Sequence, residues 1–143
     1  MSKILLTLIF SSLFLNSHGA FAHGVDKPGP HGGFIRMPGA FHTEVLPQGK
    51  NKLKIYLLDI NWKAPSLSQS SLEVTLEDGN LKNKAQCHTK DDYYLCSFQN
   101  TVDLTQKGNL KVLAQRENQK GEEDSYELPF KLKKIDNGHE GRH

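Results

Sequence analysis

The sequence predicts an all-β protein, a single immunoglobulin-like β-sandwich of about seven to eight antiparallel strands. Several short segments alternate apolar and polar residues, which is the period of a half-buried strand. Turn residues separate these segments at roughly the 8–12-residue spacing of a sandwich, and no stretch has a convincing helical period. The length of 143 residues suits one such domain.

The first two predicted strands form a hairpin around the turn signal Pro38-Gly39. GGFIRM precedes this turn and AFHTEVL follows it. In FHTEVL the residues alternate between two faces, so His42 and Glu44 share one face of their strand. His31 lies at the open end of the hairpin, and the unknown register decides whether it reaches that face.

The next segments repeat the same alternation. KLKIYLLDI, SLEVTLED and NLKVLAQ each place an apolar residue at every second position. The segment SYELPFKLK continues the pattern, and Pro129 on its outward parity favours an edge strand. The acidic run GEEDS before it is expected to be a solvated turn. The predicted inward faces comprise Leu53, Ile55, Leu57, Leu72, Val74, Leu76, Leu110, Val112, Ala114, Tyr126, Leu128, Phe130 and Leu132.

The two cysteines, Cys87 and Cys96, flank the segment HTKDDYYL, which is typical of two strand ends around a charged turn. In an exported protein an even pair is most simply a disulfide, here one between neighbouring strands of a hairpin. A thiolate metal site is the alternative interpretation.

The N-terminus is typical of a secretory signal peptide over residues 1–22. Lys3 precedes an apolar run, and Ala20-Phe21-Ala22 has the small-x-small form of a cleavage site. The alternative is a membrane anchor, but the apolar run of about 12 residues is shorter than the ~20 of a spanning helix. We therefore expect a periplasmic or secreted protein with no stable membrane span after cleavage.

After cleavage, three segments are predicted. A flexible N-terminal lead covers 23–30, the sandwich covers 31–134, and a disordered tail covers 135–143. The formal net charge of +2 comes without a basic patch interleaved with aromatic residues, so no nucleic-acid partner is expected. No nucleophile or zinc-protease motif is present, so no catalytic residues are assigned and no enzyme is predicted.

Histidines carry the functional signal. His23, His31 and His42 fall within the first 20 residues of the mature chain, and imidazole suits copper, zinc and nickel. His31 and His42 are the preferred ligands, and Glu44 is either a further ligand or a partner that orients His42. The alternative for His42 is a solvated side chain on the outer face of a strand.

His23 offers a second kind of donor. At a mature N-terminus its free amine and ring nitrogen form a chelate that copper(II) favours. The alternative is that cleavage merely leaves a histidine there. Met37 is the only methionine after the leader, and a copper(I) carrier usually brings several soft ligands. Cu(II) or Zn(II) is therefore the expected cofactor.

The stretch GPHGGFIRMPGAFHTEVL…KLKIYLLDINWKAP resembles the small periplasmic β-domain found with heavy-metal efflux systems, including an N-terminal part of some membrane-fusion proteins. The resemblance covers about a quarter of the chain and implies metal handling outside the cytoplasm, with a periplasmic efflux component as partner. The long helical hairpins and lipoyl-like domains of membrane-fusion proteins have no counterpart here. The matching residues are Gly29, His31, Gly32, Gly33, His42, Glu44, Val45, Tyr56, Leu57, Asp59 and Pro65.

These observations predict a periplasmic metal-binding protein for copper or zinc, acting in heavy-metal resistance, sequestration or delivery. The competing hypothesis is an exported immunoglobulin-like interaction module without metal, in which the glycines and prolines only shape an edge hairpin. A copper monooxygenase that uses His23 is a third hypothesis, which the small size of the mature chain disfavours.

Overall fold

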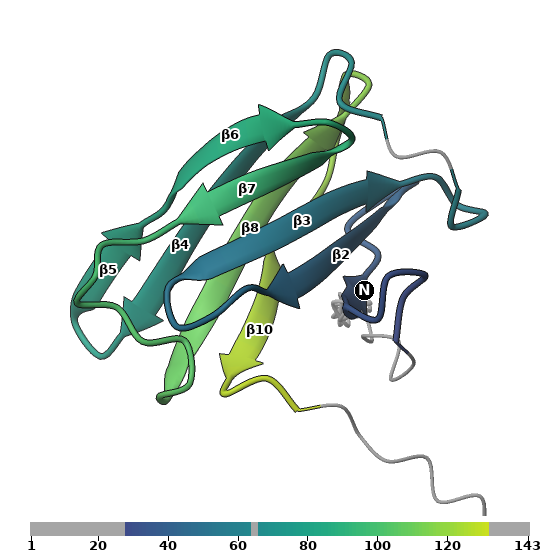
Figure 1. Ribbon diagram of the computed structural model, residues 1–143. Helices are drawn as coiled ribbons and strands as arrows, with labels where there is room; N and C mark the ends of the chain where they lie inside the picture. The colour runs from purple at the N-terminus through teal and green to yellow at the C-terminus, as the bar shows by residue number, and fades with distance from the viewer. Residues whose placement is uncertain (1–27, 64–65, 132–143) are drawn as a thin grey trace, which may run out of the picture.

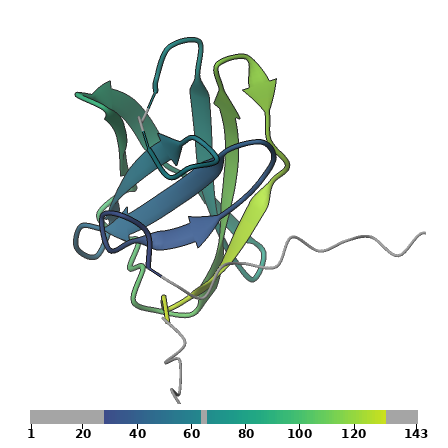
Figure 2. The ribbon, with the colours of Figure 1, turned by 90° about the vertical axis from the view of Figure 1, so that its right-hand side faces the viewer.

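The computed structural model describes residues 28–63 and 66–131, and these residues form two antiparallel sheets packed face to face (Figure 1). The predicted all-β sandwich is confirmed, with ten strands in place of about eight. The turned view separates the layers, with the blue strands in one and the yellow-green strands in the other (Figure 2).

Sheet A holds the N-terminal hairpin at one edge and the disulfide hairpin at the other. Its strand order is β1 (Phe34–Arg36), β2 (His42–Pro47), β3 (Lys52–Leu58), β7 (Tyr93–Ser97) and β6 (Gln86–Lys90). Sheet B has the order β10 (Asp124–Leu128), β8 (Gly108–Arg116), β4 (Ser71–Asp78) and β5 (Leu81–Lys84), and β9 (Gln119–Lys120) pairs with β8.

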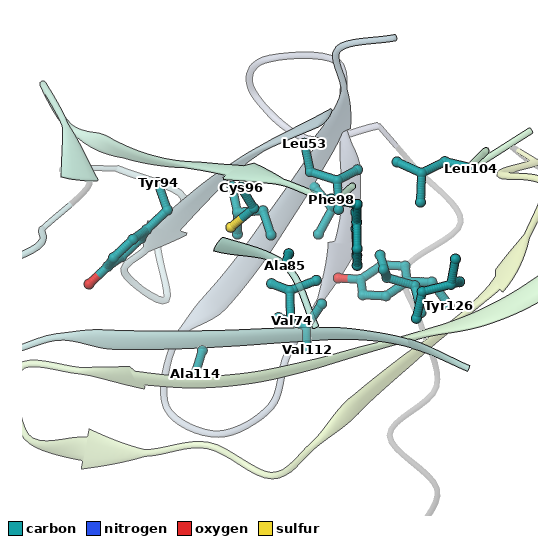
Figure 3. Packing of buried hydrophobic residues seen from close by; sticks show 14 of the residues in the cluster. Leu53, Val74, Ala85, Tyr94, Cys96, Phe98, Leu104, Val112, Ala114 and Tyr126 are labelled. Atoms are coloured by element: carbon teal, nitrogen blue, oxygen red, sulfur yellow. The ribbon is translucent and has the colours of Figure 1, made fainter. Parts of the chain in front are cut away.

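The core lies between the sheets and uses the predicted inward faces. Leu53 of sheet A points toward Val74 and Val112 of sheet B, and the Tyr126 ring lies in the same layer between the sheets (Figure 3). Burying such side chains is the main favourable term in folding, at about 25 cal/mol per Å² of apolar surface. The alternation in the sequence therefore predicted correctly which face of each long strand points into the core.

Two strand boundaries differ from expectation. β10 ends at Leu128, directly before Pro129, because proline has no amide hydrogen for the ladder. Ahead of it, Asp124 is 6% exposed and belongs to β10, so the acidic run is only partly the solvated turn that we expected.

The hairpin of β6 and β7 carries the predicted disulfide. Cys87 and Cys96 are directly opposite in the register, and their sulfur atoms are bonded. This crosslink is typical of proteins made for an oxidising compartment, which agrees with export. None of the described residues belongs to a helix that could cross a bilayer.

The β1–β2 hairpin turns at residues 38–41, as predicted, and pairs Ile35 with Glu44. Its inner face meets the core, while its outer face is covered by the chain that precedes β1 and by the loop that follows β3. Tyr56 and Leu58 on the outer face of β3 are buried as a result. This covered outer face contains the candidate site.

Candidate functional site

Glu44 anchors the turn that leads into β1. Its side chain is fully buried on the outer face of β2. The amides of His31 and Gly33 donate to Oε1 at 2.8 and 2.9 Å, and the His31 Nδ1 lies 2.7 Å from Oε2. Three donors on one buried carboxylate offset the cost of removing its charge from water.

The glycines of the HGG stretch allow this close approach. The Gly29 amide donates to the Gly33 carbonyl at 2.9 Å, and Gly32 has a φ of +81° that suits glycine. A Cβ on Gly29 would overlap Glu44 Oε1, and a Cβ on Gly33 would lie 2.7 Å from Leu46. The described turn thus includes Gly29, within the last residues of the predicted N-terminal lead.

The His31 ring lies flat on Tyr56. The two ring centroids are 3.8 Å apart with an interplanar angle of 1°, and the His31 side chain keeps 35% of its surface exposed. Burial, and then the charge of Asp92, raises the pKa of Tyr56, so its phenol stays neutral. His31 is therefore oriented on two sides, by a carboxylate and by an aromatic face.

His42 is held by a different loop. It is 4% exposed, so it is not the solvated surface residue of the alternative interpretation. Its Nδ1 donates to the Asp59 carbonyl at 3.0 Å, and its ring stacks on Trp62 at 3.7 Å. The Asp59 carboxylate in turn accepts the Lys63 amide at 2.8 Å, which closes the loop over His42.

Both imidazoles hydrogen-bond to the rest of the protein through Nδ1. A carbonyl oxygen only accepts, so the His42 Nδ1 carries the hydrogen, and an ionised Glu44 imposes the same tautomer on His31. In the neutral ring Nε2 then bears a lone pair. Neither Nε2 bonds to a described residue, so both nitrogens keep their capacity to act as ligands.

Of the predicted ligands, the structure brings His31 and Glu44 into contact, whereas His42 bonds to the loop that follows β3. Glu44 orients His31, whereas the sequence suggested that it would orient His42. His42 lies two residues from Glu44 on β2, a spacing of about 7 Å. Within residues 28–63 and 66–131, no group of three or more His, Cys, Asp or Glu side chains is placed to hold a metal ion. His23 lies outside the described residues.

Sequence reasoning missed a buried polar cluster on the inner side of β2. The Thr43 hydroxyl donates to Asp124 Oδ2 at 2.9 Å and lies 3.2 Å from the Tyr126 hydroxyl. The Arg36 guanidinium lies over the Tyr126 ring at 4.6 Å. Burial raises the pKa of Asp124 to about 6, against the lowering effects of Thr43 and Arg36. The sequence did carry a signal for this cluster, because Asp124 has the same parity as the inward-facing Tyr126 and Leu128.

No protein-family model, curated protein or solved structure matches this chain.

Proposed function

We propose that this chain is an exported, periplasmic metal-binding protein for copper or zinc, acting in metal resistance, sequestration or delivery. The observation that supports it is the anchoring of His31 and His42. Each ring has its Nδ1 bonded to an oxygen of the fold, at 2.7 and 3.0 Å, which leaves Nε2 for a metal. Metal-binding histidines commonly have this outer partner, because it fixes the tautomer and raises the basicity of the ligand.

Glu44 supports His31 in this proposal and does not bind the metal itself, since both of its oxygens already accept hydrogen bonds. A transition-metal site commonly needs three or four donors. We propose that His23 supplies the remaining ones through its amine and ring, and that a periplasmic efflux component is the partner.

Asparagine substitutions give a sharp test. The Asn amide replaces the Nδ1–H donor of His31 and His42 but offers no counterpart of Nε2. We would titrate the mature protein, with His23 at its native N-terminus, against Zn(II) and Cu(II) by calorimetry. We expect His31→Asn/His42→Asn to weaken binding at least about tenfold, while the exposed His88→Asn control on β6 binds like the wild type.

Wild-type binding no tighter than micromolar, or an unchanged affinity in the double variant, would reject the site. One residue added before His23 tests the N-terminal chelate alone, and an unaltered Cu(II) affinity removes His23 from the ligand set.

A second candidate is the exported interaction module without metal. The lack of a three-donor group among the described residues favours it. In that function the Glu44 anchor only shapes the N-terminal hairpin, and the calorimetric titration shows no metal binding in any variant.

A further inference from the structure

Soft and apolar groups gather where β2 begins and β3 ends. Figure 1 shows these two strand ends side by side, and the register pairs His42 with Leu58 there. Met37 and Ile60, on the two flanking loops, are 46% and 56% exposed. Among the described residues, only Leu81 and Leu113 are other large hydrophobic residues with comparable exposure.

The register of β1 and β2 runs toward Met37 and His42. β1 pairs Ile35 with Glu44 and Arg36 with Thr43, and the ladder ends there; the same register continued by one residue would set Met37 opposite His42. Ile35 and Glu44 are both packed beneath Gly29, on the outer face of the sheet. Met37 has the same parity as Ile35, and directly opposite residues have Cβ atoms about 5 Å apart. With the register continued in this way, the thioether would come within reach of the His42 ring.

The orientation of His42 points to the same neighbour. β2 lies between β1 and β3 in sheet A. The His42 Nδ1 is bonded to the Asp59 carbonyl, which follows β3. In this tautomer the Nδ1–H bond and the Nε2 lone pair point to roughly opposite sides of the ring. Nε2 is therefore directed away from β3 and toward the side of the sheet on which β1 ends at Arg36, one residue before Met37.

The indole of Trp62 shields this imidazole. Trp62 has a φ of 67°, a left-handed conformation that is rare for a bulky residue. The Asp59 carbonyl accepts the Trp62 amide at 3.1 Å, and its carboxylate accepts the Asn61 amide at 2.8 Å, so one residue imposes this conformation. Backbone strain of this kind concentrates at functional sites. Here it keeps an aromatic ring stacked on His42.

We propose that Met37 Sδ and His42 Nε2 form a copper(I) site, with Trp62 limiting access of water and oxidants to the ion. This inference rests on the proposed metal-binding function and specifies its metal. Thioethers are soft ligands that select Cu(I), whereas Zn(II) prefers imidazole, thiolate and carboxylate. The single methionine of the mature chain led us to expect Cu(II), but in this proposal that methionine has an imidazole partner.

The test compares Met37→Leu with wild type under anaerobic conditions. Leucine keeps the volume and apolar character of the side chain and removes only the sulfur. Copper(I) is maintained with ascorbate instead of a thiol, so that the Cys87–Cys96 disulfide stays oxidised, and affinity is measured by competition with a chromogenic Cu(I) chelator. Trp62 is the only tryptophan in the sequence, so its fluorescence reports the location of binding.

We expect Met37→Leu and His42→Asn each to weaken Cu(I) binding at least about tenfold and to suppress the change in Trp62 emission. Zn(II) affinity should stay within about twofold in Met37→Leu, and Ile60→Val, the matched control on the other loop, should bind Cu(I) like wild type. An unchanged Cu(I) affinity in Met37→Leu overturns the Cu(I) site. If Zn(II) or Cu(II) still binds through the two histidines, the proposed metal-binding function survives that result. If no metal binds the wild type, both proposals fail.

Discussion

Two buried carboxylates, on opposite sides of β2, differ in the hydrogen-bond donors that surround them. Glu44 on the outer side is fully buried and accepts two backbone amides and an imidazole N–H. Asp124, which contacts the inner side through Thr43, is 6% exposed, and among the described residues that hydroxyl is the hydrogen-bond donor to it, with Arg36 nearby.

The difference shows what a buried charge requires. A turn folded around Glu44 delivers several donors at once, because consecutive amides converge on one oxygen. Two strands facing each other across a core deliver only isolated side-chain donors to Asp124. Burial therefore dominates at Asp124 and raises its pKa to about 6.

Removing the outer carboxylate should have the largest effect. We expect Glu44→Ala to lower the free energy of unfolding by about 4 kcal/mol, because it leaves the buried amide of Gly33 and that of His31 without their acceptor. Urea denaturation measures this loss. Glu44→Gln keeps one carbonyl oxygen for the amides and should lose less than half as much. Equal losses would show that the charge, and not the acceptor, holds the turn.

The inner carboxylate should make stability depend on pH. The folded pKa of Asp124, about 6, lies above the unfolded value of 3.8. The folded state therefore binds the proton more tightly, and stability falls as the pH rises between these values, by about 3 kcal/mol in total. In Asp124→Asn this component is absent, so its stability relative to wild type should increase from pH 4 to pH 7. A constant difference across that range would contradict the raised pKa.

Packing around Glu44 can be tested through the glycines. Gly29→Ala should cost about 2–3 kcal/mol, because the added methyl overlaps the Glu44 carboxylate and Ile35. Gly32→Ala meets no atom within 4 Å and should cost only about 1 kcal/mol, from its φ of +81°. Thermal unfolding of the two variants makes the comparison. If Gly32→Ala proves the more costly, backbone conformation matters more than contact with the carboxylate.

A smaller effect than that of Gly29→Ala is expected from removing the hydroxyl that donates to Asp124. Thr43→Val should cost about 1–2 kcal/mol at pH 7 and less at pH 4.5, where the carboxyl is protonated. It should also move the pH transition upward, because Thr43 lowers the pKa of Asp124. Thr43→Ser retains the hydroxyl and is the control. An identical pH profile in Thr43→Val would show that this hydrogen bond does not influence the titration.

Much of the fold could be predicted because strand periodicity is local. The face of Val74 or Val112 follows from its parity within one strand, and the hairpin at Pro38-Gly39 follows from adjacent turn residues. The same parity predicted that His42 and Glu44 share a face, and the cysteine spacing predicted the disulfide. Sheet order could not be predicted, because it depends on which distant strands pair.

The sequence by itself therefore determined the sandwich class, the inward faces and the residue types of the candidate site. Only the tertiary structure decided their partners: Glu44 with His31, His42 with Trp62, and Thr43 with Asp124. Each of these contacts joins a strand to a loop or to the facing sheet, across 13 to 81 residues. Alternation gives the side on which a residue lies, whereas its partner depends on how loops and sheets pack in three dimensions.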